Sequence, residues 1–343
     1  MGINLHILNI SDIEKYDLQK MYKVYDEWPN IARKSFESNQ KPINFDNIDH
    51  IVFAGMGGSG AIGDIFFSIL SKTGIHVNIV KGYLLPTTVD SNTLVITVSV
   101  SGNTMETLAV LEAAHKKKSK IIAFSSGGKM LDYCTKNKID HRLVTQHHSP
   151  RGSFTSYLYT ILKVLHSFLN IKHQDILESI RELEKTGKKN NSSNLTENNS
   201  SLNLAEWIKD IPMIYHPNGL QPVAIRFKNS LQENCKIHAI TEDVIEACHN
   251  GIVSWEVKTN VKPILIQGVD DYIKTKERWK VLKEYFKENE INFYEVTSIE
   301  GSILTKIINL IYYLDYTTLY SAILSKRDPS PVISIDKIKN RIN

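Results

Sequence analysis

The stretch His50-Ile-Val-Phe-Ala-Gly-Met-Gly-Gly-Ser-Gly60 decides how the rest of the chain is interpreted. Residues 50–54 have the apolar character of a buried strand, and the glycine cluster Gly55–Gly60 follows without a break. Residues 62–71 are then predicted to form a helix. A strand that runs through a glycine-rich turn into a helix is typical of the start of a parallel α/β sheet.

Strand-like and helix-like runs alternate on both sides of this stretch. The expected strands are 50–54, 77–80, 93–98, 120–124, 142–145, 211–215, 236–240, 263–267 and 292–296. The expected helices are 11–37, 62–71, 105–117, 154–169, 174–185, 222–234, 272–289 and 302–326. This alternation predicts an α/β protein with two doubly wound parallel-sheet lobes, each built as three αβα layers.

A polar, low-complexity run separates the two halves. Residues 188–201 are rich in Asn, Ser and Lys and poor in apolar side chains, which predicts a flexible linker. The predicted organisation is therefore an N-terminal helix with a first domain over 1–187, the linker over 188–201, and a second domain with C-terminal helices over 202–343.

Composition places the chain among ordinary soluble proteins, with 42% hydrophobic and 23% charged residues. The formal charge of +4 suits a small anionic substrate and does not indicate a nucleic-acid partner. The N-terminal residues lack signal-peptide character, and the apolar run 303–324 is interrupted by Lys306, Asn309 and Asp315. We therefore expect a cytoplasmic protein without a membrane partner.

Two turns are suited to an anion. The first contains Gly58 and Ser59, and the second, directly after the strand 93–98, contains Ser99, Ser101 and Thr104. Helix N-termini attract phosphate through their N–H groups, and hydroxyls add further donors. One such turn would most often only cap its helix. Two of them at the ends of parallel strands predict a phosphate site at the carboxyl edge of the sheet.

The residues of the glycine cluster are also compatible with two other interpretations. Gly55-x-Gly57-x-x-Gly60 matches a dinucleotide fingerprint, and Lys81 suits a 2′-phosphate, although the second strand lacks the usual acidic residue. An NADP-dependent oxidoreductase is therefore an alternative. The cluster also fits a tight turn that serves helix packing and nothing else.

The motifs resemble those of the bifunctional phosphoglucose/phosphomannose isomerases. The resemblance rests on the glycine cluster and the serine turn, with further matches at Pro150–Gly152, Asn229–Asn234, Cys248–Asn250, Asp328–Val332 and Ile335–Lys339. The polar run 188–201 departs from the family pattern, as does Gly251, where the family usually has Glu. The resemblance implies two sugar-isomerase (SIS) domains, no metal or other cofactor, and a homodimer in which His249 completes the neighbouring site.

Aldose–ketose isomerisation needs a base that moves a proton between C1 and C2, a group that opens the sugar ring, and cations that stabilise developing oxyanions. The resemblance assigns these roles to Glu233 as base, His249 as ring opener, and Arg151 with Lys339 as cations. The residues alone would not select them, since most glutamates and histidines are solvated.

The expected reaction interconverts glucose 6-phosphate, and also mannose 6-phosphate, with fructose 6-phosphate through a cis-enediol. The expected partner is therefore a hexose 6-phosphate. A non-catalytic phosphosugar sensor is the alternative, because it would need the hydroxyl turns without Glu233 and His249.

Overall fold

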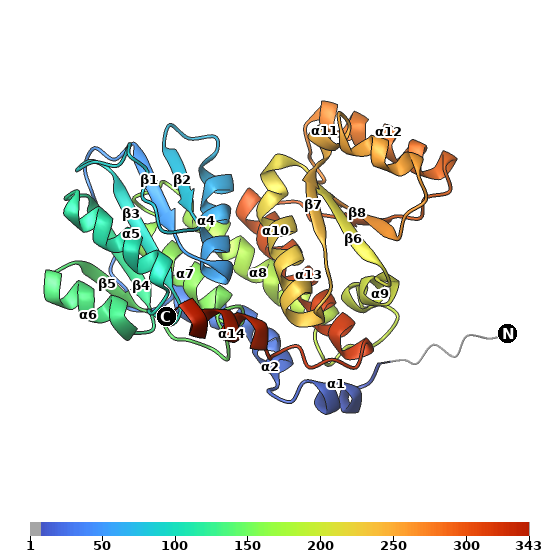
Figure 1. Cartoon of the computed structure of the whole chain (residues 1–343), viewed down its shortest axis with the longest axis horizontal. Helices are drawn as coiled ribbons and strands as arrows, with labels where there is room; N and C mark the ends of the chain where they lie inside the picture. The colour runs from blue at the N-terminus through green and yellow to red at the C-terminus, as the bar shows by residue number, and fades with distance from the viewer. Residues whose placement is uncertain (1–7, 343) are drawn as a thin grey trace. The chain divides into compact units, whose positions relative to one another are not determined.

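The computed structural model describes residues 8–342, which divide into two compact units. The N-terminal sheet unit contains residues 27–184 and 301–307. The C-terminal sheet unit contains the described residues 8–26, 185–300 and 308–342. This division differs from the predicted boundaries, because residues 8–26 group with the C-terminal sheet. Figure 1 shows a twisted sheet within each unit.

The N-terminal sheet unit is built on a parallel sheet with the strand order β2-β1-β3-β4-β5. Its strands are β1 (His50–Ala54), β2 (His76–Val80), β3 (Leu94–Ser99), β4 (Lys120–Ser125) and β5 (Asp140–Leu143). Every residue of the central strand β3 is buried, as expected for a parallel strand covered on both faces. The predicted strands of this half are confirmed to within a few residues.

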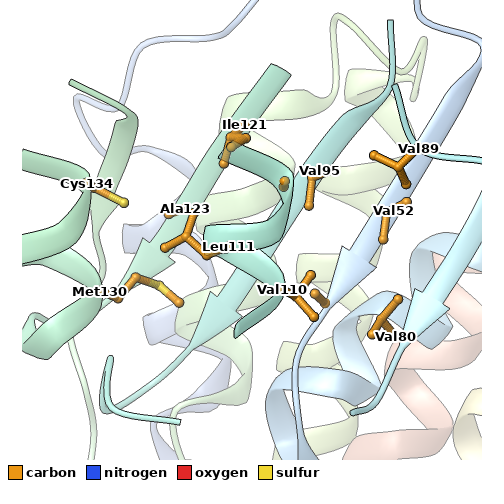
Figure 2. Packing of buried hydrophobic residues seen from close by; sticks show 12 residues of the cluster. Val52, Val80, Val89, Val95, Val110, Leu111, Ile121, Ala123, Met130 and Cys134 are labelled. Atoms are coloured by element: carbon orange, nitrogen blue, oxygen red, sulfur yellow. The ribbon is translucent and has the colours of Figure 1, made fainter. Parts of the chain in front are cut away.

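Helices cover this sheet, and one face shows how the core is made. The helices are α3 (Trp28–Phe36), α4 (Gly57–Leu70), α5 (Met105–Lys116), α6 (Gly128–Asn137), α7 (Phe154–Leu165) and the first part of α8 (His173–Asn190). Val52 and Val95 of the strands, Leu111 of α5 and Met130 of α6 belong to one cluster of buried hydrophobic side chains (Figure 2). The sequence did not predict α6, whose buried side chains are only Met130 and Cys134.

The C-terminal sheet unit repeats the topology in a smaller parallel sheet, ordered β7-β6-β8-β9. Its strands are β6 (Ile211–His216), β7 (Ile240–Asp243), β8 (Val261–Gln267) and β9 (Tyr294–Thr297). Its helices are α1 (Ile10–Tyr16), α2 (Met21–Asp26), α9 (Ser200–Trp207), α10 (Gln221–Ser230), α11 (Val244–Ala247), α12 (Ile273–Glu288), most of α13 (Ile303–Leu324) and α14 (Ile333–Ile342). Two parallel α/β lobes, as predicted, are thus confirmed.

The segment predicted as a flexible linker is folded instead. Residues 188–201 contain the end of α8, a set of hydrogen-bonded turns and the start of α9. Asn199 is buried, and its side chain accepts from the backbone N–H of Leu202 at 3.0 Å, which caps α9. The hydroxyl of Tyr320 donates to the buried backbone carbonyl of Asn190 at 2.6 Å. The polar residues therefore serve as caps and turn formers, which composition alone does not distinguish from a linker.

Two element boundaries also differ from the sequence prediction. The helix expected over 11–37 is divided into α1, α2 and α3, and Asn9 rather than Ser11 caps α1. The strand expected over 236–240 begins only at Ile240, because the preceding helical turn extends to Cys235 and Lys236 adopts a left-handed backbone with φ of 59°.

Helix α13 carries the polar residues that interrupt its apolar run. Asp315 lies 1% exposed within the C-terminal sheet unit, where it pairs with Arg226 of α10 at 2.6 Å. Such a pair satisfies the buried charges of both side chains. Within residues 8–342, none of the helices combines the length and apolarity needed to cross a membrane.

Candidate active site

The glycine cluster places the start of α4 directly against the sheet. A β-carbon on Gly55 would lie 2.9 Å from the carbonyl oxygen of Val98, and one on Gly60 would lie 2.7 Å from the carbonyl oxygen of Gly55. Only glycine allows this close approach. The N-cap position is Met56, whose side chain makes no capping hydrogen bond. The N–H groups of the first turn are therefore not satisfied by a side-chain cap, and they form an anion-suited end.

The serine turn between β3 and α5 keeps its hydroxyls together. Ser99 Oγ and Thr104 Oγ1 are 2.9 Å apart, and the backbone N–H of Asn103 donates to Ser101 Oγ at 3.2 Å. Thr104 occupies the N-cap of α5, yet its side chain makes no capping hydrogen bond. Gly102 has φ of 68°, and a side chain there would collide with the carbonyl of Gly127. The hydroxyls are thus not used to cap α5, contrary to the simplest interpretation of such a turn.

Both turns lie at one edge of the sheet. Strands β1 and β3 are parallel neighbours, with Ala54 paired to Thr97. The order β2-β1-β3 means that the connections diverge between these two strands. Ligands of doubly wound sheets bind at such a switch point, at the carboxyl ends of the strands. The residues that the structure brings to this edge are Gly58, Ser59, Ser99, Ser101 and Thr104.

Arg151 lies beside the first of these turns. A β-carbon on Gly58 would be 3.4 Å from the carbonyl oxygen of Pro150 and 3.7 Å from the Cα of Arg151. Arg151 is 5% exposed, and the next residue is held by Trp28, whose indole N–H donates to the carbonyl of Gly152 at 2.9 Å. A guanidinium stays charged at every physiological pH. The predicted cation is therefore built into the same unit as the hydroxyl turns.

Lys81, which the dinucleotide alternative assigns to a 2′-phosphate, is paired with a carboxylate. Lys81 Nζ lies 2.7 and 2.6 Å from the two carboxylate oxygens of Asp64 on α4. Burial raises the pKa of Asp64, and the neighbouring Lys81 opposes this effect. The strand order is also of the flavodoxin type, not the order of dinucleotide-binding folds. The structure thus does not favour an NADP site.

Glu233 lies in a π-helical turn, Leu231–Cys235, which directly follows α10. The side chain of Glu233 is half-buried. The neighbouring Asn234 is buried, and its amide donates to Thr318 Oγ1 of α13 at 2.8 Å. Turns of the π type are rare and often occur at functional sites. The sequence predicted an ordinary helix here, because no residue pattern marks a π turn.

His249 lies on an exposed turn that follows α11. Asp243 begins α11, and its carboxylate accepts from the backbone N–H of Ile245 at 2.8 Å. The backbone N–H of His249 donates to the carbonyl of Glu246 at 2.8 Å, and the side-chain amide of Asn250 donates to the Glu246 carboxylate at 2.5 Å. The backbone of the histidine turn is therefore defined while its imidazole is accessible.

Sequence reasoning missed Glu242, which lies against Gly251. A β-carbon on Gly251 would be 2.5 and 2.9 Å from the two carboxylate oxygens of Glu242. The carboxylate at the end of β7 thus fills the space that a side chain at 251 would take. Burial raises the pKa of Glu242, and the nearby charges of Glu246 and Asp243 add to this effect. No single-sequence signal pairs these positions, because only the fold brings residue 242 to residue 251.

Cys248, next to His249, lines a cavity of about 490 Å³ together with Arg278, Leu282 and Tyr285. Burial raises the pKa of the Cys248 thiol, although Arg278 opposes this effect. A thiol held protonated is a poor nucleophile. Cys248 therefore gives no support to thiol chemistry at this turn.

The predicted site residues fall into two groups. The hydroxyl turns and Arg151 belong to the N-terminal sheet unit, whereas Glu233, His249 and Lys339 belong to the C-terminal sheet unit. Lys339 lies on α14, which buries none of its residues. Among residues 8–342, no cluster of three or more His, Cys, Asp or Glu side chains is arranged as a metal site.

The fold and the anion-suited turns define a protein of two sugar-isomerase domains. Residues 45–170 match the SIS domain. Residues 197–342 match the bacterial phospho-glucose isomerase C-terminal SIS domain. The C-terminal domain of a glucosamine-fructose-6-phosphate aminotransferase from Francisella tularensis has the same fold, with a TM-score of 0.69 at 17% identity over 91% of this chain and 98% of that chain.

Curated relatives make the assignment more specific. A bifunctional phosphoglucose/phosphomannose isomerase of Caldicellulosiruptor bescii is 30% identical over 338 residues, which cover 94% of this chain and 98% of that protein. The protein of the same name from Thermoplasma acidophilum is 31% identical over 313 residues, covering 90% and 93%. The chain belongs to the bifunctional phosphoglucose/phosphomannose isomerase family, as its motifs predicted.

Proposed function

We propose that this chain interconverts glucose 6-phosphate and mannose 6-phosphate with fructose 6-phosphate. The observation that carries the proposal is the pair of turns at one sheet edge whose hydroxyls are not used as helix caps, with Arg151 beside them, in a chain that belongs to a family of isomerases. Such an edge suits the phosphate of a sugar. The sensor alternative is not favoured, because relatives over nearly the whole chain are isomerases.

In the proposed mechanism, the substrate phosphate accepts hydrogen bonds from Ser59, Ser99, Ser101 and Thr104 and from the backbone near Gly58. These donors are uncharged, so they orient the phosphate without competing for the proton in transit. Arg151 and Lys339 stabilise negative charge on the sugar oxygens as the enediol forms. Arg151 is already buried in the folded protein, so its guanidinium loses little further water when the substrate binds.

Proton transfer is assigned to the two remaining residues. His249 takes the proton of the anomeric hydroxyl and returns one to the ring oxygen, which opens the ring. Glu233 then removes the proton from C2, a proton passes from the hydroxyl on C2 to the oxygen on C1, and Glu233 returns its proton to C1 of the cis-enediol. The reverse transfers regenerate the aldose. A carboxylate suits this task because it can give back the same proton from the same position. Acceptance of both C2 epimers requires little steric selection at C2.

The proposal also includes a homodimer in the cytoplasm, with His249 completing the site of the partner subunit. The exposed imidazole on a defined turn supports this role, since a side chain that serves a second copy must be accessible on its own chain. Mixing a His249→Asn variant with a Glu233→Gln variant tests it. Restored activity is expected, because such a heterodimer would contain one site with both residues intact.

The test of the function is a coupled assay on all three hexose phosphates with the wild-type protein and Glu233→Gln. Removal of a general base is expected to lower kcat by about 10²- to 10⁴-fold, with KM changed much less. Glu288→Gln on the exposed face of α12 is the matched control and should behave as the wild type. A Glu233→Gln protein with near-normal turnover would contradict the proton-transfer assignment.

A further inference from the structure

Lys236 directly follows the Glu233 turn, and its ammonium group contacts backbone carbonyl oxygens of two segments. Its Nζ lies 2.7 Å from the carbonyl oxygen of Glu233 and 3.4 Å from that of Asn234. It also lies 3.1 Å from the carbonyl oxygen of Asp328 and 3.3 Å from that of Pro329. All these residues belong to the C-terminal sheet unit.

The chemistry of the site explains why a lysine serves here. The last carbonyls of a helical segment lack partners within the segment, and together they carry partial negative charge. An ammonium group offers three N–H donors and a full positive charge, so it can satisfy several carbonyls at once. Lys236 reaches them by adopting a left-handed backbone, with φ of 59°. This conformation is unfavourable for a residue with a β-carbon, and the contacts must offset its cost.

Other contacts hold the same turn from its buried side. Asn234 donates to Thr318 Oγ1, and Cys235 Sγ lies 2.9 Å from the carbonyl oxygen of Thr318. These bonds fix the residues after Glu233 against α13. The carbonyl of Glu233 itself is held by Lys236, whose contacts lie at the exposed side of the turn. Arg327 Nη1 also donates to the carbonyl oxygen of Cys235, so two cations contact the carbonyls of this turn, and the ammonium group of Lys236 contacts that of Glu233.

We propose that Lys236 is a positioning residue for Glu233: it fixes the π turn that carries the base and joins that turn to residues 328–329. The segment that it holds leads into α14, which carries Lys339 and buries none of its own residues. Lys236 would thus help to set the backbone of the π turn and of the segment that precedes α14. The catalytic part of this inference rests on the proposed function of Glu233.

The experiment compares Lys236→Met with Lys236→Arg and Lys326→Met. Lys326 is a matched control, because it is also exposed and left-handed, with φ of 57°, and its ammonium forms no hydrogen bond within residues 8–342. We expect Lys236→Met to lower kcat by about 10- to 100-fold, since small misplacements of a catalytic group have effects of this size. KM should change by less than about threefold, because other residues hold the phosphate. Lys236→Arg should keep most of the wild-type kcat, and Lys326→Met should leave kcat unchanged.

Hydrogen exchange tests the positioning independently of activity. Amides of residues 231–237 and 328–330 should exchange faster in Lys236→Met, and no such change is expected in Lys326→Met. In the Glu233→Gln background, adding Lys236→Met should cause no further loss of kcat, because both changes affect one step. Unchanged exchange, or full kcat in Lys236→Met, would overturn the inference. An inactive wild-type protein with faster exchange in Lys236→Met would refute the proposed function while leaving Lys236 as the tie between the two segments.

Discussion

The hydroxyl turns of the N-terminal sheet unit and the Glu233 turn of the C-terminal sheet unit are built on different principles. The hydroxyls of the first type of turn are held locally, since Ser99 contacts Thr104, although Gly55 and Gly102 let the backbone pass close to the carbonyls of Val98 and Gly127. The Glu233 turn is held by side chains and carbonyls of Thr318, Asp328 and Pro329, far along the chain. The hydroxyl donors of one turn can thus be held together by residues close in the chain, whereas the turn that carries the base is supported by distant ones.

The largest effect on stability is expected beneath the Glu233 turn. Asp315 accepts from Arg226 and also from Ser230 Oγ, at 2.9 Å, just before the π turn. Asp315→Asn would remove the carboxylate that pairs with the buried guanidinium of Arg226, which should lower the free energy of unfolding by about 3–5 kcal/mol. Urea denaturation measures this change. Glu184→Gln, which breaks the half-exposed pair with Arg33, is the control and should cost less than about 1 kcal/mol. Equal effects of the two substitutions would show that the buried network does not support the turn.

A smaller effect, seen in binding instead of turnover, is expected at the hydroxyl turns. Ser99→Ala or Thr104→Val removes one donor to the phosphate, worth about 1.5–3 kcal/mol, or roughly 10- to 100-fold in KM. The value of kcat should change little, which is the opposite of the pattern expected for Lys236→Met. Steady-state kinetics separates the two patterns. Ser71→Ala, at the other end of α4, is the control, since its hydroxyl donates to the carbonyl of Ser68. A fall in kcat at unchanged KM would contradict the division of roles.

The smallest effect concerns Glu242 beside Gly251. Its pKa is raised by burial and by Glu246 and Asp243, so the folded protein holds this proton more tightly than the unfolded chain does. The stabilising contribution of the protonated form is complete below the unfolded pKa and is lost as pH rises through the folded pKa. Glu242→Gln should therefore raise the melting temperature slightly at pH 7 and give no gain at pH 4. Thermal melts at both pH values measure this difference. A gain of equal size at pH 4 would show that charge is not the cause.

Much of the fold could be predicted from the sequence, because its signals are local. The buried strand 50–54 and the glycine cluster after it mark a parallel sheet wherever they occur. The prediction failed where a residue's partner is distant. The Asn- and Ser-rich run 188–201 looked like a linker, but Asn199 and Ser201 are buried caps and anchors. Helix α6 was missed for another reason: it buries few side chains, so its hydrophobic pattern is too weak to predict a helix.

The sequence by itself determined the topology of two parallel α/β lobes, the two anion-suited turns and the family, since each depends on residues adjacent in the chain. Only the tertiary structure decided that Glu233 lies in a π turn, that Lys236 holds that turn to residues 328–329, and that Glu242 fills the space over Gly251. The reason is physical: a hydrogen bond or a steric contact between residues far apart in sequence exists only after the chain has closed the loop between them.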